Sequence, residues 1–362
     1  MLHKLILPLL FLTFLTEAQT SLQTVIQKGH SAAVKSVAID KSGKYLATGS
    51  RDRSVKLWDL EKGIEIRSFL GHEYTVNSLQ FSTSGKYLIS GSADNTAKLW
   101  DVVTGKEIFS TPKQNKYITD VAIAPNEKYI AVAGYNDNLQ VYEIPSGKLI
   151  KEIPVNSEQG TGYGIDIEFS EDGKYLAVGE DDKTARVFRT EKWDSLYTFK
   201  PAEGWCGGCP TFVAFSKDGK YLAKLSRKEK LKIFDLQTGK KIKETGIEVD
   251  EIAGLKYSND GKRILVAAEK KITEYEAGSG KIINTINIPD DKGELNEIIY
   301  NADESEVICA FGKNIAISFN LKTGKESRVY KGIINLQDAG GLNYDQDNYR
   351  ESYIAKYLRL KN

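Results

Sequence analysis

The chain has 362 residues, of which 41% are hydrophobic and 27% charged, and these proportions exclude a largely disordered protein. Its formal net charge of +1 excludes a broad electrostatic field that would attract nucleic acid or an anionic membrane, so we expect neither partner. The 19 Tyr and 13 Phe residues favour β-structure.

The segment 1–18 has the pattern of a secretory signal peptide. Lys4 provides a basic start, an apolar run occupies 5–15, and Ala18 ends a stretch typical of a cleavage site. The apolar run is too short to span a bilayer, so we expect no membrane insertion after its removal. We therefore predict an exported protein, periplasmic or secreted, of a kind typical of bacteria.

A short phrase, Gly-Lys-Tyr followed by an aliphatic residue, recurs after this segment, twice with one residue changed. Its lysines are spaced 42, 42, 46, 46 and 42 residues apart, at Lys44, Lys86, Lys128, Lys174, Lys220 and Lys262. Periods in this range are typical of stacked supersecondary units. Such units bury their apolar faces against one another, so we expect function to reside on the assembled surface.

Each period contains four short strand signals, which we call a, b, c and d. An alternating apolar run is followed by a turn with Gly or Asn, a second run, a third run that ends in an aromatic residue, and a fourth run. The a runs are 34–39, 76–81, 118–123, 165–169, 211–215, 252–257 and 295–300. Four antiparallel strands per period predict one blade, and the whole chain predicts an all-β fold with a single closed β-propeller.

The first two repeats carry a more specific signature. They contain Gly29-His30 followed by Leu57-Trp58-Asp59, and Gly71-His72 followed by Leu99-Trp100-Asp101. The chain resembles the WD-repeat β-propeller family over residues 22–331, with seven full repeats. The resemblance is strongest in repeats one and two, and period and turns carry it in the others.

The sequence leaves the number of blades open between seven and eight. Residues 22–28 precede repeat one as a fourth strand would, and we expect them to close the ring by pairing with the last blade. Repeat seven nevertheless has its own fourth strand signal at 326–330, and strand-like runs occur at 339–344 and 353–360. We therefore expect seven blades, or eight with a partial last blade within 332–362.

The resemblance implies a buried hydrogen-bond chain that links an Asp, a His, a hydroxyl and a Trp within a repeat. The matching residues are Asp52, His30, Thr48 and Trp58 in repeat one, and Asp94, His72, Ser90 and Trp100 in repeat two. An Asp, a His and a hydroxyl can also form a nucleophilic triad. Because the set recurs in two repeats and its hydroxyl belongs to a buried strand, we interpret it as structural and expect no catalytic residue.

Cys206 and Cys209 have the spacing of redox-active cysteine pairs. Such pairs stand at a helix N-terminus, whereas strand signals flank this pair on both sides. We interpret the pair as a small structural disulfide, with thiol–disulfide exchange or metal binding as alternatives. No nucleotide or cofactor motif occurs, and no other His, Cys or carboxylate grouping has metal-ligand spacing, so we expect no cofactor and no metal.

Two connections between repeats are long, before repeats four and five. The resemblance implies that the d-to-a and b-to-c connections share one face, which is often the partner-binding face. Aromatic residues of the long connections and several residues of the b-to-c turns are therefore candidates for partner binding. They are Tyr163, Trp205, Arg51, Tyr135, Asp181 and Arg227.

These observations predict a monomeric, non-enzymatic scaffold that binds a protein or peptide on this face. One alternative is an enzyme or a carbohydrate-binding protein that uses the central channel. It requires polar side chains that converge on the axis, and we find no repeating polar position of this kind in the sequence. Another alternative is thiol–disulfide exchange through Cys206 and Cys209.

Overall fold

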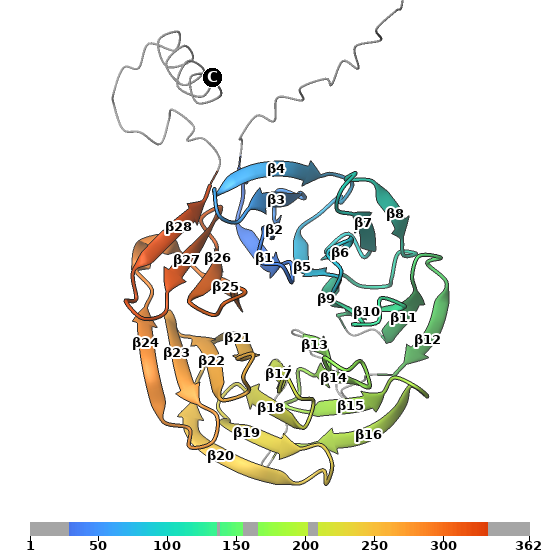
Figure 1. Ribbon diagram of the computed structural model, residues 1–362. Helices are drawn as coiled ribbons and strands as arrows, with labels where there is room; N and C mark the ends of the chain where they lie inside the picture. Colours follow the sequence, from blue (N-terminus) through green and yellow to red (C-terminus); the bar gives the residue numbers. More distant parts are fainter. Residues whose placement is uncertain (1–28, 136–137, 155–165, 202–208, 332–362) are drawn as a thin grey trace, which may run out of the picture.

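The computed structural model describes residues 29–135, 138–154, 166–201 and 209–331. These residues form seven four-stranded antiparallel sheets, which are arranged as blades around a central axis (Figure 1). Strand a of each blade is innermost and strand d is outermost. The prediction of an all-β propeller is confirmed, and the described residues make seven blades.

Each blade is built from four strands that are consecutive in the chain. Blades 1 to 4 comprise β1 (Val34–Ile39), β2 (Tyr45–Ser50), β3 (Val55–Asp59) and β4 (Ile64–Phe69); β5 (Val76–Phe81), β6 (Tyr87–Ser92), β7 (Ala97–Asp101) and β8 (Glu107–Ser110); β9 (Ile118–Ile123), β10 (Tyr129–Gly134), β11 (Leu139–Glu143) and β12 (Leu149–Ile153); β13 (Asp166–Phe169), β14 (Tyr175–Gly179), β15 (Ala185–Arg189) and β16 (Asp194–Phe199). Blades 5 to 7 comprise β17 (Thr211–Phe215), β18 (Tyr221–Ser226), β19 (Lys230–Asp235) and β20 (Lys241–Glu248); β21 (Ile252–Tyr257), β22 (Arg263–Ala268), β23 (Lys271–Glu276) and β24 (Ile282–Asn287); β25 (Leu295–Tyr300), β26 (Glu306–Phe311), β27 (Ile315–Asn320) and β28 (Glu326–Tyr330). A short 3₁₀ turn, η1 (Asp290–Lys292), precedes β25.

The Gly-Lys-Tyr phrase forms the turn between strands a and b. Its glycine has a positive φ, 70° at Gly43 and 71° at Gly85, which residues with a Cβ rarely adopt. Blade 3 places Glu127 there, with a φ of 55°. The lysine carbonyl accepts a hydrogen bond from the residue that follows strand c, as from the amide of Leu60 to Lys44 at 2.9 Å. These bonds hold the a–b and c–d turns together on one face of the ring.

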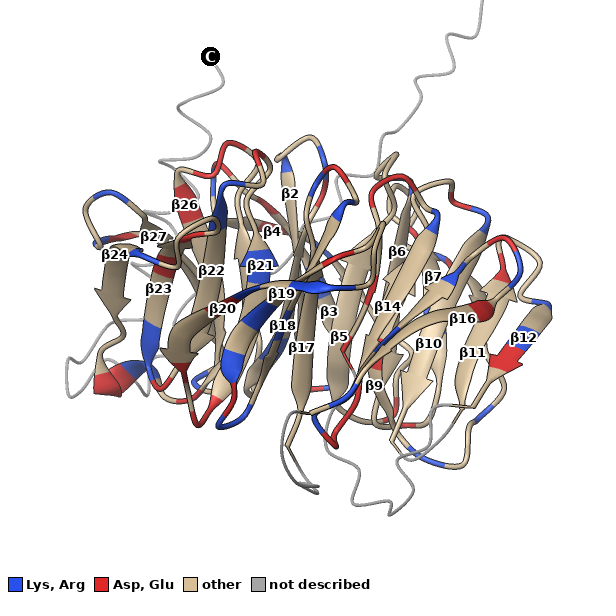
Figure 2. Ribbon diagram, turned by 90° about the horizontal axis from the view of Figure 1, so that it is seen from below, with Lys and Arg blue, Asp and Glu red and all other residues tan. Residues whose placement is uncertain are grey.

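The other face, which we call the loop face, contains the d–a connections and the b–c turns. In five blades an amide of the b–c turn donates a hydrogen bond to a carbonyl of the connection that enters the blade. Seen from the side, charged residues gather mainly in the turns of the two faces (Figure 2). The two kinds of connection therefore share a face, as the resemblance implies. The bonded pairs are Arg51 with Ala33, Ala93 with Thr75, Tyr135 with Tyr117, Glu269 with Glu251, and Gly312 with Glu294.

The hydrophobic core consists of layers between blades. The described residues contain seven clusters of buried apolar side chains, and each cluster joins two neighbouring blades. Between blades 1 and 2, for example, Phe69 packs against Trp100, with ring centroids 5.7 Å apart. Because every blade buries both of its faces in this way, a single repeat has no complete core of its own.

Side chains close the ring between blades 7 and 1. Trp58 and Tyr330 meet edge to face, with ring centroids 6.3 Å apart, and the Tyr330 hydroxyl donates to the carbonyl of Leu60 at 3.2 Å. Asn296 Nδ2 donates to the carbonyl of Val34 at 2.7 Å. Within the described residues no strand crosses this junction. The segments 22–28 and 332–362, predicted to close the ring and to form a partial eighth blade, lie outside the described residues.

The closing junction is expected to be more sensitive to substitution than an interior junction. Asn296→Ala removes the bond to Val34 and also the acceptor for Lys35 Nζ, which lies 2.6 Å from Asn296 Oδ1. Asn77→Ala is a matched control, because Asn77 occupies the same position in β5 and donates to the carbonyl of Ile118 at 2.7 Å. We expect a loss of about 2 kcal/mol in the free energy of unfolding for Asn296→Ala and about 1 kcal/mol for Asn77→Ala, measured by urea denaturation. Equal losses would contradict a special role for closure.

Candidate functional site

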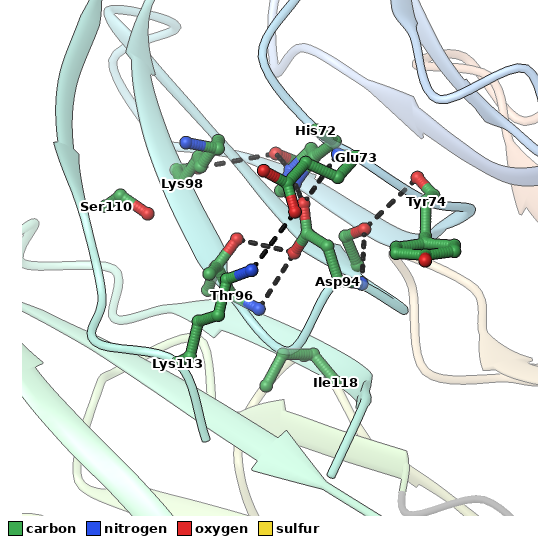
Figure 3. Close-up of polar contacts among 12 residues, drawn as sticks. His72, Glu73, Tyr74, Asp94, Thr96, Lys98, Ser110, Lys113 and Ile118 are labelled. Carbon is green, nitrogen blue, oxygen red and sulfur yellow. Dashed lines mark hydrogen bonds and ion pairs between the residues drawn. The ribbon is translucent and has the colours of Figure 1, made fainter. Parts of the chain in front are cut away.

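Blade 2 contains the predicted chain of four polar side chains, and its contacts with the b–c turn are shown in Figure 3. His72 Nδ1 lies 2.7 Å from Asp94 Oδ2, and His72 Nε2 lies 2.7 Å from Ser90 Oγ. Trp100 Nε1 donates to Ser90 Oγ at 2.8 Å. Since the indole can only donate, the Ser90 hydroxyl can donate to Nε2, and Nδ1–H then donates to Asp94. Every polar side-chain atom of this four-residue hydrogen-bond network then has a hydrogen-bond partner.

Asp94 also organises the b–c turn around it. Its carboxylate accepts hydrogen bonds from the amide of Glu73 at 2.9 Å and from the amide and hydroxyl of Thr96 at 2.9 and 2.6 Å. Burial opposes ionisation of Asp94, but the hydrogen bonds from His72 and Thr96 outweigh it and hold the pKa of this carboxyl well below its usual range. The network therefore fastens the d–a connection and the b–c turn to strands b and c.

Blade 1 repeats this geometry with a threonine. His30 lies 2.8 Å from Asp52 and 2.7 Å from Thr48 Oγ1, and Trp58 Nε1 donates to the same oxygen at 2.8 Å. The hydroxyls are inaccessible, because Thr48 is 1% exposed and Ser90 is 0% exposed. A nucleophile must reach its substrate, so the geometry argues against a catalytic triad in either blade.

Blade 5 has a buried cluster of charged side chains in place of this hydrogen-bond network. Lys224 occupies the strand position of Thr48 and Ser90, is 1% exposed, and places Nζ 2.8 Å from Glu229 Oε2. Lys232 Nζ lies 3.2 Å from the same carboxylate oxygen. Burial lowers the pKa of Lys224, whereas the hydrogen bond from Lys224 contributes to a lowered pKa of Glu229 against its own burial. This blade is therefore braced by charge pairs that the repeat signature does not predict.

Carboxylates on the innermost strands join neighbouring blades around the axis. The innermost strand of a blade is a sheet edge with unpaired amides. Asp120 Oδ2 accepts from the amide of Ile167, and Asp166 Oδ2 accepts from the amide of Val213, both at 2.7 Å. In the same way, the amide of Phe215 donates to Glu168 Oε1 at 3.2 Å, and the amide of Val37 donates to Glu297 Oε2 at 2.7 Å. Each acid thus satisfies an edge amide of the next blade.

Asp120, Asp166, Glu168, Glu297 and Lys256, which we call the channel cluster, influence one another's pKa values. Burial, and next the neighbouring Asp166, raise the pKa of Asp120 to about 8. Burial raises the pKa of Glu168 and of Glu297 to about 7 although Lys256 opposes it. Lys256 has a raised pKa, because four carboxylates outweigh its burial. In the described part of the chain, no His, Cys, Asp and Glu side chains are grouped so that they could hold a metal ion.

Polar side chains therefore do converge on the axis, although we found no repeating polar position of this kind in the sequence. By their pairing with strand b, Asp120, Asp166 and Glu297 occupy equivalent positions of strand a, and Glu168 and Lys256 occupy a second equivalent position. No ionisable residue type occupies either position in more than two blades, so the period alone does not reveal them. An alignment of the seven a strands by register would have shown five ionisable residues in two columns.

Three of the residues predicted to bind a partner lie on the loop face. Arg51 and Arg227 are exposed in the b–c turns of blades 1 and 5. Tyr135 is half-buried in the b–c turn of blade 3, and its ring stacks on Tyr117, with centroids 4.9 Å apart. Tyr163 and Trp205 lie outside the described residues, so their contribution stays a prediction.

The prediction for Asp181 is wrong. Its side chain is buried, with the residue 6% exposed, because the connection to blade 5 covers this b–c turn. The amide of Cys209 donates to the carbonyl of Asp181 at 2.9 Å. The backbones of Asp182 and Cys209 form an isolated parallel β-bridge. Asp181 is therefore inaccessible to a partner.

The cysteine pair is described in part. Cys209 is disulfide-bonded and 3% exposed. Cys206, its predicted partner, lies outside the described residues, so the pairing stays a prediction. Cys309 is a free thiol in β26 and is completely buried, which raises its pKa.

A hollow of ≈680 Å³ opens on the loop face over blades 5, 6 and 7, and we call it the blade 5–7 hollow. Pro210, Ile252 and Leu295 provide apolar contact area in it. Its volume is in the range of ligand pockets. Six charged side chains also line it, namely Arg227, Asp250, Glu251, Glu269, Lys270 and Glu294.

Comparison with known proteins agrees with this architecture. The family model described as "WD domain, G-beta repeat" matches residues 20–59, 63–101 and 154–189. The chain therefore contains WD40 repeats, arranged in a seven-bladed β-propeller. The prediction of a WD-repeat propeller is confirmed to this extent.

Curated relatives match the chain over about one repeat. A ribosome biogenesis protein BOP1 homolog of Aedes aegypti is 44% identical over 48 residues, which is 13% of this chain and 6% of that protein. The homolog of Drosophila virilis is 35% identical over 48 residues, with the same shares of both chains. The homolog of Arabidopsis thaliana is 50% identical over 36 residues, or 10% of this chain and 5% of that protein. The chain thus spans about 6% of the length of these relatives.

These names correct our prediction of location. We predicted an exported protein, periplasmic or secreted, from the pattern of residues 1–18. The relatives are named for ribosome biogenesis, a process inside cells, and this contradicts an exported location. The segment 1–18 itself lies outside the described residues. In the described part of the chain, no helix is long and apolar enough to cross a membrane.

Proposed function

We propose that this protein is a non-enzymatic scaffold that binds a protein or peptide partner on its loop face. The observation that carries the proposal is a group of exposed tyrosines on the connections of blades 2 and 3. Tyr74 is 59% exposed and Tyr117 is 36% exposed, and the ring of Tyr135 stacks on Tyr117. Tyrosine gives a large contact area at low entropic cost and is enriched in binding hot spots. Arg51 and Arg227 add charged contacts on the same face.

The alternatives have less support. An enzyme that uses the central channel would need carboxylates free to act on a substrate, whereas Asp120, Asp166 and Glu297 each accept a backbone amide of the next blade. Thiol–disulfide exchange would need an accessible sulfur, and Cys209 is 3% exposed. The shared stretch with the relatives has the length of one repeat, so it supports a likeness of repeats and no more.

The proposal is tested by comparing partners of the full chain and of tyrosine variants in cells that make the protein. Tyr74→Ala and Tyr117→Ala are expected to weaken partner capture after crosslinking about 30-fold, as is typical of a hot-spot loss of about 2 kcal/mol. Val103→Ala is the matched control, because Val103 is 76% exposed in the c–d turn on the opposite face. Unchanged capture by both tyrosine variants, or equal loss in the control, would show that the partner binds elsewhere.

A further inference from the structure

The blade 5–7 hollow carries an excess of negative charge. Four carboxylates and two cations line it, which gives the lining a formal charge of 2 − 4 = −2. The whole chain, in contrast, has a net charge of +1. A lining with an excess of one charge attracts the opposite charge.

The two cations of the lining lie close to acidic groups already. Lys270 Nζ lies 2.6 Å from Asp290 Oδ1, a residue outside the lining. Arg227 Nε lies 3.8 Å from Asp250 Oδ1. Glu251, by contrast, is exposed, and its carboxylate has no hydrogen-bond or ion-pair partner within the part of the chain that the structure describes. A further cation in the hollow would therefore meet an unneutralised carboxylate.

The rim of the hollow is held in a strained conformation. Glu269 and Lys270 form the two-residue turn between β22 and β23, with φ values of 50° and 61°. Such a turn strongly favours Asn-Gly, because both residues have positive φ. Long charged side chains in this conformation cost stability, and strain of this kind clusters at ligand sites. No other b–c turn of the described chain has two consecutive residues with positive φ.

We propose that the blade 5–7 hollow receives a lysine or arginine side chain of a bound peptide segment, with an apolar residue beside it. The inference rests on the proposed function, since it names the partner chemistry of the same face. The cationic head is placed near Glu251 and Glu269, and the aliphatic stem packs on Ile252 and Leu295. Its volume of ≈680 Å³ accommodates both side chains.

The test is selection of binders to the full chain from a phage-displayed library of random dodecapeptides. We expect the enriched peptides to share a Lys or Arg beside an apolar residue. A synthetic copy of one such peptide, measured by fluorescence anisotropy, is expected to bind Glu251→Lys about tenfold more weakly than wild type and to weaken with added salt. The same peptide with Glu in place of its basic residue is expected to prefer Glu251→Lys over wild type.

A second variant separates loss of the site from loss of folding. Glu269→Asn with Lys270→Gly installs the favoured turn, so it is expected to unfold at a temperature equal to or above that of wild type and yet to bind the peptide more weakly. The proposal is overturned if no peptide is enriched, if the enriched peptides lack basic residues, or if both variants bind them as wild type does. A negative result in the peptide experiment does not change the outcome of the tyrosine experiment, because that experiment tests a surface on blades 2 and 3.

Discussion

Asp94→Ala is expected to lower the free energy of unfolding by about 3 to 5 kcal/mol, the usual cost of removing one partner of a buried charged network. The substitution leaves His72 without its acceptor and the amides of Glu73 and Thr96 without theirs. Unpaired buried donors cost far more than the bonds contribute when intact. Urea denaturation followed by circular dichroism measures the effect.

Asp182 offers a matched control, because it occupies the equivalent position in blade 4. The amide of Thr184 donates to it at 2.8 Å, and no histidine contributes. Asp182→Ala should therefore cost only about 1 kcal/mol. If the two substitutions lower the free energy of unfolding equally, the four-residue hydrogen-bond network gives blade 2 no additional stability. A double variant with His72→Ala should lose less than the sum of the single losses, because both residues act in one network.

The stability of the propeller is expected to fall by several kcal/mol between pH 5.5 and pH 8.5 because of the channel cluster, with about 3 kcal/mol of this loss from Asp120 alone. In the folded protein the pKa of Asp120 is raised to about 8, and those of Glu168 and Glu297 to about 7. Folding therefore favours the protonated acids. Their stabilising contribution is complete below the unfolded pKa, near 4, and is lost as the pH rises through the folded pKa.

Lys256 and Asp94 do not mask this trend. Lys256 has a raised pKa, so its contribution is lost only above pH 10.5. Asp94 has a lowered pKa, so its contribution is lost only as the pH falls below its unfolded value. Asp120→Asn should flatten the slope and raise the unfolding temperature at pH 8.5 relative to wild type. Asp235→Asn, at a half-buried acid with a lowered pKa, should leave the slope unchanged. A wild-type stability that rises toward pH 8.5 contradicts the assignment.

The repeat signature predicts most of the fold, because it is local. Six of the seven a runs coincide with the observed strands, as at Val34–Ile39 and Leu295–Tyr300. The fourth run, 165–169, is observed from Asp166, and residue 165 lies outside the described residues. Turn glycines with positive φ and alternating apolar residues act within a few residues of chain, so they can be read in order.

The candidate sites were predicted less completely. The residues around His30 and His72 are brought together as the resemblance implies, because each set lies within one repeat. Asp181 was misplaced, since its burial depends on the connection that enters the next blade. The exposed Tyr74 and Tyr117 were missed, because strand signals do not report which connection residues remain uncovered.

The repeating unit, its four strands and the two histidine networks follow from the sequence, because each depends on residues that are close along the chain. The contacts that the ring brings together depend on the tertiary structure. Val37 and Glu297 are 260 positions apart and meet only because blade 7 closes on blade 1. The blade 5–7 hollow likewise draws its lining from three repeats. Such contacts depend on the angle between blades, which side-chain packing at seven junctions sets and which no single period encodes.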